Sequence, residues 1–159
     1  MKALILGSGG QLGTAMRRLL PGAVACTRQQ ADFARPETLR TVVMESKCAL
    51  VLNCAAYNAV DQAERDVAGA FAVNALAPRE LALACREAGA LLVHFSTNYV
   101  FGLEEARHTP YRESDVPGPL SVYGISKLAG EQFVQAHCPN HLVIRTCGLF
   151  GPIDHPFAP

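Results

Sequence analysis

Apolar and polar residues follow two different periods along this chain. Five short apolar runs indicate buried strands, and they cover residues 2–6, 23–26, 49–53, 90–95 and 141–146. Between them lie longer segments whose apolar side chains recur three or four positions apart, as on one face of a helix, over residues 11–20, 36–47, 61–88 and 121–137. In the third of these segments, Pro78 predicts a kink or a restart of the helix. The chain is therefore expected to alternate strand and helix.

Short connections between alternating strands and helices are typical of a parallel sheet with helices on both faces. Right-handed crossovers then favour an α/β fold with a doubly wound sheet of the Rossmann type, its strands in the order 3-2-1-4-5 when numbered along the chain. With 159 residues, half of them apolar, the chain suits one domain with one core. The irregular stretch 101–120 follows the fourth strand, at the edge where ligands of such sheets bind.

Composition excludes several classes of partner. The chain has 14 basic and 14 acidic residues, so it predicts no basic face for nucleic acid or for an anionic membrane. No stretch approaches the roughly 20 apolar residues of a membrane span. The six cysteines form no C-x-x-C pair and several lie in apolar runs, as expected of reduced thiols in a cytoplasmic protein. No metal site is expected.

A glycine-rich segment joins the first strand to the first helix. Gly7, Gly10 and Gly13 are spaced so that the turn can be tight and the backbone can approach a pyrophosphate. The helix that follows would present its free N–H groups to the phosphates. No acid ends the second strand to bind a ribose 2′-hydroxyl; Arg28 stands there, either to pair with the 2′-phosphate of NADP or as a solvated loop arginine.

Tyr123 and Lys127 lie four residues apart at the start of the last helical segment, so they share one face. Reduction of a ketone by hydride needs a proton donor at the developing alkoxide, and an adjacent ammonium would lower the pKa of a tyrosine for that task. A hydroxyl of Ser96 or Thr97, directly after the fourth strand, could bond both the substrate oxygen and the tyrosine. The sequence therefore predicts a reductase site.

Two further positions are open to alternatives. The small residues Ala55 and Ala56 after the third strand either leave room for a ribose or serve packing. Asn74, inside a helical segment, would hold a water, hold a backbone carbonyl, or cap the kink before Pro78.

The chain resembles the extended short-chain dehydrogenases/reductases, and within them the dTDP-4-dehydrorhamnose reductase family. The resemblance covers residues 1 to about 151, and its longest strings are far more specific than the glycines. The stretches that carry it are Gly10-Gln-Leu-Gly13, Ala31-Asp-Phe33, Asn53-Cys-Ala-Ala-Tyr-Asn-Ala-Val-Asp-Gln-Ala-Glu64, Val73-Asn-Ala75, Ser96-Thr-Asn-Tyr-Val-Phe101, Pro110-Tyr-Arg-Glu113, Val122-Tyr-Gly-Ile-Ser-Lys-Leu-Ala-Gly-Glu131 and Ile144-Arg-Thr146.

The resemblance implies hydride transfer from NADPH or NADH to the 4-keto group of dTDP-4-dehydro-L-rhamnose, and a nucleotide sugar as the partner. Arg28 slightly favours NADP as the cofactor. It implies a catalytic set of Thr97, Tyr123 and Lys127, and substrate contacts from Thr97 and Asn98. The implied cofactor contacts are Gly10, Gln11 and Leu12 for the pyrophosphate, Asp32 and Phe33 for the adenine, and Ala56, Tyr57, Asn58 and Phe95 along the groove. A homodimer is the alternative to a monomer.

The chain also departs from that family. Asn98 replaces an aspartate, and Cys147-Gly148 replaces a small residue followed by tryptophan. Family members continue beyond the point where this chain stops, so residues 1–151 are expected to form the NAD(P)-binding domain and 152–159 a tail without the substrate lobe. The alternatives are a non-catalytic NADP-binding regulatory subunit, like that of methionine adenosyltransferase, and a reductase or epimerase of another nucleotide sugar.

Overall fold

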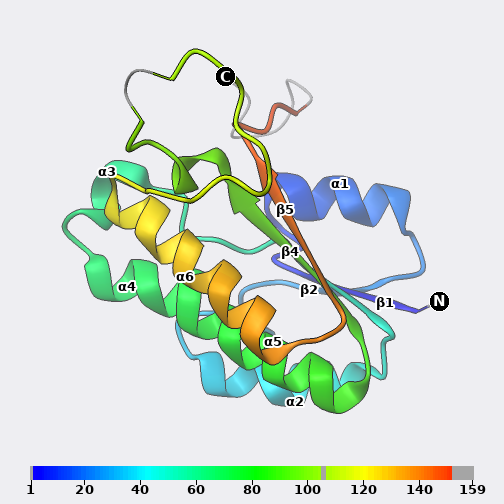
Figure 1. Ribbon diagram of the computed structural model, residues 1–159. Coiled ribbons are helices and arrows are strands. Elements are labelled where there is room, and N and C mark those ends of the chain that lie inside the picture. The colour runs from blue at the N-terminus through cyan, green and yellow to red at the C-terminus, as the bar shows by residue number, and fades with distance from the viewer. Residues whose placement is uncertain (1, 105–106, 152–159) are drawn as a thin grey trace.

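A five-stranded parallel sheet forms the centre of the computed structural model, which describes residues 2–104 and 107–151 (Figure 1). All five predicted strands are confirmed, with their ends within two residues of the expected positions. They are β1 (Ala3–Leu6), β2 (Val24–Cys26), β3 (Leu50–Asn53), β4 (Leu91–Thr97) and β5 (His141–Thr146). Ser96 and Thr97 are the last two residues of β4, so they follow the apolar run but lie inside the strand. The expected tail, residues 152–159, lies outside the described residues.

The strand order is β2-β1-β3-β4-β5, so the predicted order 3-2-1-4-5 is wrong. The third strand pairs with the first on the side opposite β2, and Leu4 of β1 lies beside Val51 of β3. Burial explains the difference, because β3 is almost fully buried and takes a central position, whereas the three-residue β2 is only partly buried. Ala31 and Phe33 follow β2 in the sequence and are buried in the core, but they do not form a further strand next to β2.

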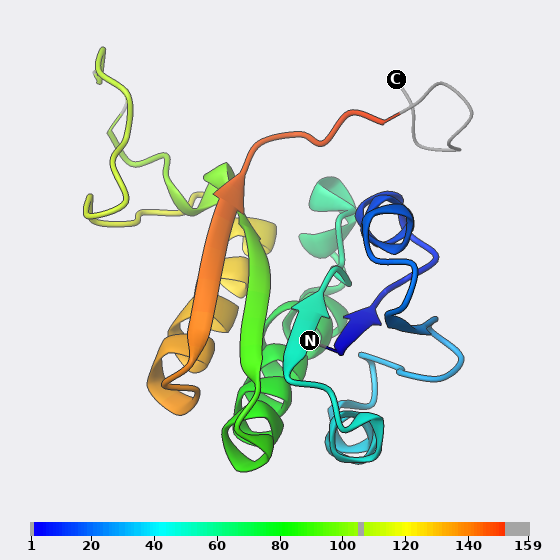
Figure 2. The same ribbon diagram turned by 90° about the vertical axis from the view of Figure 1, so that its right-hand side faces the viewer.

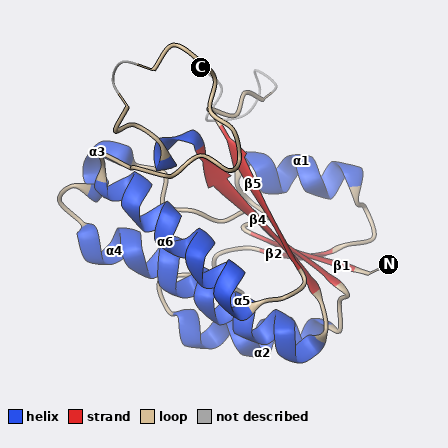
Figure 3. Cartoon of the chain, in the orientation of Figure 1, coloured by secondary structure: helices blue, strands red, loops and turns tan. Residues whose placement is uncertain are grey.

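Helices connect all the strands and cover both faces of the sheet (Figure 3). They are α1 (Gln11–Leu19), α2 (Leu39–Ser46) after the 3-10 turn η1 (Pro36–Thr38), α3 (Val60–Ala63), α4 (Val67–Phe71), the π-helical η2 (Ala72–Leu76), α5 (Ala77–Ala88), the 3-10 turn η3 (Asn98–Val100) and α6 (Val122–His137). The doubly wound α/β fold class is therefore confirmed.

The helical segment predicted over residues 61–88 is interrupted. It ends after α3 and restarts at α4, where the Asp66 carboxylate caps the new helix by accepting a hydrogen bond from the Gly69 N–H at 3.0 Å. The π turn of η2 ends at Leu76, and α5 begins at Ala77 with Pro78 in its first turn, in agreement with the predicted restart.

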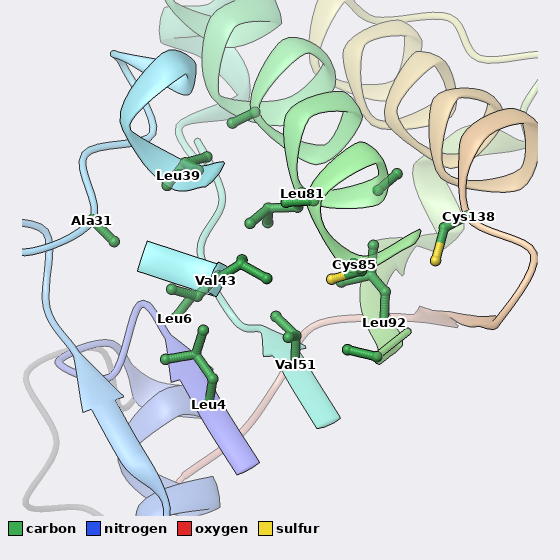
Figure 4. Packing of buried hydrophobic residues seen from close by; sticks show 14 of the residues in the cluster. Leu4, Leu6, Ala31, Leu39, Val43, Val51, Leu81, Cys85, Leu92 and Cys138 are labelled. Atoms are coloured by element: carbon green, nitrogen blue, oxygen red, sulfur yellow. The ribbon is translucent and has the colours of Figure 1, made fainter. Parts of the chain in front are cut away.

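The two faces of the sheet carry cores of unequal size. On one face, Leu4, Leu6 and Leu92 pack against Leu81 of α5 and Val43 of α2, in a large cluster that reaches α6 (Figure 4). The other face has a smaller cluster of Ile5, Leu52 and Val93, against which α1 packs through Met16. On that second face β5, at the edge of the sheet, leaves Leu142 exposed.

One helix corrects the expectation about membrane spans. The continuous helical segment Val67–Ala88 is long and apolar enough, by length and composition alone, to cross a membrane. In this fold it is a core element, with Ala70, Leu81 and Cys85 fully buried. Among the described residues the six cysteines are free, and four of them are buried, as their place in apolar runs predicted.

Candidate active site

The predicted site residues are distributed along one edge of the sheet. Because all five strands are parallel, their carboxyl ends meet at this edge, the upper one in Figure 2. In spatial order it carries Arg28 after β2, the glycine turn after β1, Ala55 to Asn58 after β3, and Thr97 and Asn98 at the end of β4. The residues predicted to contact the dinucleotide and the substrate therefore lie in a row along this edge.

The glycine turn brings the backbone of β1 against that of β3. Gly7 has a φ of 72°, and a Cβ at this position would lie 2.8 Å from the Ala55 backbone nitrogen. A Cβ on Gly13 would lie 2.2 Å from the Gly7 carbonyl oxygen, so α1 approaches the turn closely. Gly10 precedes α1 in an extended conformation without a side-chain cap. The first N–H groups of this nine-residue helix are therefore not capped by its N-cap residue, as an anion site requires.

At the β2 end of the edge, Arg28 and Asp32 form a loose ion pair of 3.8 Å, and the Arg28 side chain is 86% exposed. Asp32 also pairs with Arg35 at 3.4 Å. Phe33, by contrast, is buried in the main core, so the structure does not present its ring as a surface for adenine. Phe33 is buried by residues that are distant in the sequence, so a three-residue motif does not reveal its environment.

The segment after β3 is fixed by two asparagines. The Asn53 side chain accepts from the Ala55 N–H at 3.2 Å and contacts His94 Nδ1 at 2.9 Å. Asn74 accepts from the Tyr57 N–H at 2.8 Å and donates to the Tyr57 carbonyl at 3.1 Å. Of the three alternatives for Asn74, the structure supports contact with a backbone carbonyl, and the two bonds hold the segment that was expected to line the groove.

The α6 helix places Tyr123 and Lys127 next to the end of β4. Ser121 caps this helix by accepting from the Gly124 N–H at 3.1 Å. A Cβ on Gly124 would lie 2.4 Å from the Tyr99 carbonyl oxygen, so this glycine lets α6 pack tightly against η3, the turn that follows Thr97. The Thr97 side chain lies beside the Tyr123 hydroxyl, and both residues are buried. The pattern predicted these neighbours, but it did not reveal Gly124 as the residue that permits the approach.

Between the two hydroxyls predicted near Tyr123, the structure favours Thr97. Thr97 Oγ1 also accepts from the Tyr99 N–H at 3.2 Å, which fixes its rotamer. The Ser96 hydroxyl is buried and has no hydrogen-bond partner within residues 2–104 and 107–151. Asn98, the expected substrate contact, is exposed at the first position of η3.

Burial raises the pKa of Tyr123, and the Thr97 side chain only partly opposes this effect. The net shift of the Tyr123 pKa is therefore upward, opposite in direction to the one expected from Lys127, because burial is the largest cause. Lys127 Nζ instead donates to the Phe95 carbonyl at 2.6 Å. Its side chain is almost fully buried, and burial lowers the pKa of Lys127 to about 8. Tyr123 is thus a protonated phenol at neutral pH, whereas the pKa of Lys127 lies only slightly above neutral pH.

The chain matches the family model described as the RmlD substrate binding domain over residues 1–158. It is 42% identical over 153 residues to a dTDP-4-dehydrorhamnose reductase of Burkholderia thailandensis, an alignment that covers 94% of this chain and 51% of that protein. The crystal structure of a dTDP-4-dehydrorhamnose reductase from Clostridium acetobutylicum has a TM-score of 0.90 and 36% identity, and the match covers 98% of this chain and 56% of that one.

A second crystal structure, that of a dTDP-4-dehydrorhamnose reductase from Bacillus anthracis in complex with NADP, has a TM-score of 0.85 and 34% identity. That match covers 92% of this chain and 53% of the other. The chain spans about half the length of the relatives that it matches.

Proposed function

Since the chain belongs to the RmlD substrate binding domain family, we propose that it supplies the cofactor-binding and catalytic part of a dTDP-4-dehydrorhamnose reductase. The reaction is the NADPH- or NADH-dependent reduction of the 4-keto group of dTDP-4-dehydro-L-rhamnose. The observation that carries the proposal is the juxtaposition of Tyr123 and Thr97 at the carboxyl edge, with Lys127 one helical turn away. The family resemblance that the motifs indicated is confirmed by the match.

The glycine turn fits a dinucleotide. Side chains at Gly7 and Gly13 would fill the space against Ala55 and the Gly7 carbonyl, and the start of α1 has no side-chain cap, so backbone N–H groups can meet a pyrophosphate. When bound, the reduced nicotinamide supplies the hydride. Arg28 is exposed enough to turn from its loose contact with Asp32 toward a 2′-phosphate, which favours NADP over NAD.

In the proposed reaction Tyr123 donates its phenolic proton to the oxygen of the 4-keto group. Its raised pKa keeps the proton in place before the reaction, as the reductive direction requires. Thr97 lies beside the phenol, so its hydroxyl can bond both the phenol and the substrate oxygen. The Lys127 ammonium provides positive charge beside the phenol, which stabilises the phenolate that forms as the proton leaves.

A second candidate is a non-catalytic NADP-binding module of the same family, and Asn98 favours it. The amide of Asn98 has no charge where the resemblance expects a carboxylate, so one acceptor for the sugar nucleotide is weakened. A reductase or epimerase of another nucleotide sugar would also fit this change. A cytoplasmic location and a nucleotide-sugar partner belong to the same proposal.

Replacing Tyr123 by phenylalanine tests the proposal. Oxidation of NADPH in the presence of dTDP-4-dehydro-L-rhamnose, followed by absorbance, should fall at least ~100-fold in Tyr123→Phe, because the proton donor is lost. NADPH binding should change less than ~3-fold. The control is Tyr111→Phe, which keeps the aromatic ring that stacks on Phe101 and removes a phenol that has no place in the proposed reaction. An unchanged rate in Tyr123→Phe would disprove the role of the phenol, and NADPH binding without turnover in the unmodified chain would favour the non-catalytic module.

A further inference from the structure

A buried ion pair lies on the same helix as Lys127, one turn further on. Glu131 is 1% exposed, and its carboxylate accepts two parallel hydrogen bonds from the Arg145 guanidinium of β5. Nε lies 2.9 Å from Oε1, and Nη2 lies 2.7 Å from Oε2. Such a forked pair fixes the orientation of both side chains as well as their separation. Neither residue belongs to the set predicted from the sequence.

Glu131 and Lys127 lie at positions i+4 and i of α6, so they share one face of the helix. Burial lowers the pKa of Lys127, and the charge of Glu131 opposes this effect. His94 of β4 also interacts with Lys127, and it is buried and neutral because burial and the Lys127 charge lower its pKa well below the ordinary value. Tyr123, one turn earlier on α6, is an uncharged phenol. Glu131 is therefore the nearby charge that favours the ammonium form of Lys127.

Arg145 is itself held in place from the other side. Its guanidinium carbon lies 5.0 Å from the centre of the Phe101 ring, which stacks on Tyr111 with 4.2 Å between the ring centres. Arg107 covers the other face of Tyr111, at 4.2 Å. Glu113 adds a further negative charge near Arg145. The stack connects the segment after β4 to the buried pair and keeps the guanidinium directed at Glu131.

We infer that Glu131, oriented by Arg145, is a positioning residue that keeps Lys127 charged one helical turn from Tyr123. The carboxylate touches neither substrate nor cofactor in this role; it acts through the lysine. Arg145 in turn prevents the carboxylate from being a buried charge without a partner, which would neutralise it and remove its effect on Lys127. The role of the pair in turnover rests on the proposed function, whereas its effect on the lysine does not.

The charge state of Lys127 can be measured directly, because the chain has only three lysines, Lys2, Lys47 and Lys127. In protein labelled with 13C at the lysine ε-carbons, an NMR titration gives a pKa for each, with Lys127→Met to assign the resonance. Glu131→Gln should lower the pKa of Lys127 by about one unit. The matched control is Glu87→Gln, which breaks the exposed pair of Glu87 with Arg40 and should leave the pKa of Lys127 unchanged.

Because Glu131→Gln leaves Arg145 without its partner, the double variant Glu131→Gln/Arg145→Met provides an independent test with no unpaired charge. It should also lower the pKa of Lys127. A pKa of Lys127 that stays the same or rises in the folded variants would overturn the inference. In assays of NADPH oxidation, the alkaline limb of kcat/KM should move to lower pH by the same amount. If the pKa of Lys127 measured by NMR falls but the alkaline limb of kcat/KM does not move, the inference about Glu131 stands and the proposed use of Lys127 in the reaction fails.

Discussion

Lys127 is a cation in a position that opposes folding. Its side chain is 2% exposed, and burial lowers its pKa to about 8 from an ordinary value of 10.5. The unfolded chain therefore binds more protons than the folded one between these two values, and stability contributed by this residue rises as the pH rises through that window. A residue retained at such a cost is expected at a site that uses it.

Lys127→Met should therefore abolish reduction and stabilise the fold. The variant removes the penalty of burying an ammonium, so its free energy of unfolding at pH 7 should exceed that of the unmodified chain by ~2–3 kcal/mol. The advantage should shrink as the pH rises from 8 to 10.5. Urea denaturation at several pH values measures it, and a variant that is less stable at pH 7 would show that the hydrogen bond to Phe95 outweighs desolvation.

Sequence spacing correctly predicted that Tyr123 and Lys127 share a helix face near Thr97, because this follows from helix and strand geometry. It did not predict the raised pKa of Tyr123 or the bond from Lys127 to the Phe95 carbonyl. Both depend on how much of the protein covers these side chains. The depth of burial results from contacts between segments that are distant in the sequence, and a local pattern does not contain it.

The α6 helix depends on glycines for its close packing. A Cβ on Gly130 would lie 2.1 Å from the carbonyl oxygen of Asn74 in the π-helical segment η2. This contact brings α6 against the helix whose Asn74 holds the Tyr57 backbone, and Asn74 also donates to Ser126 of α6 at 3.0 Å. The packing of these two helices thus connects the groove-lining segment after β3 to the helix of the proposed catalytic pair.

Gly130→Ala should destabilise the protein although alanine is the better helix former. Backbone must move to admit the methyl group, which costs ~1–3 kcal/mol after subtraction of the gain of ~1 kcal/mol in helix propensity. Gly22→Ala is the control, because a Cβ there would meet nothing within 4 Å. Thermal unfolding measures the effect, and the midpoint of Gly130→Ala should lie below that of Gly22→Ala. Equal midpoints for the two variants would mean that η2 and α6 are not in close contact.

Strand positions were predictable because apolar runs report burial, but their order was not. The order follows from which strands bury both faces, and β2 with three partly buried residues takes the edge that the prediction gave to the third strand. The break before α4 had a local signal that periodicity overlooks, since Asp66 stands three residues before Gly69 as an N-cap does.

The chain as a whole assembles an edge on which a dinucleotide can lie across β2, β1, β3 and β4. Every predicted cofactor contact except the ring of Phe33 lies along this edge or at the start of α6. No residue outside the described part of the chain is required by the proposal for cofactor binding. We therefore propose that this chain binds the cofactor without any other polypeptide.

Titration of the purified chain with NADPH, followed by the change in nicotinamide fluorescence, tests this claim most directly. We expect saturable binding of one NADPH per chain. Gly13→Val, which puts a side chain against the Gly7 carbonyl, should weaken this binding at least ~10-fold. Arg28→Ala should weaken the binding of NADPH more than that of NADH. Circular dichroism confirms that the variants are folded. Absence of binding to the folded, unmodified chain, or equal binding by folded Gly13→Val, would contradict the account.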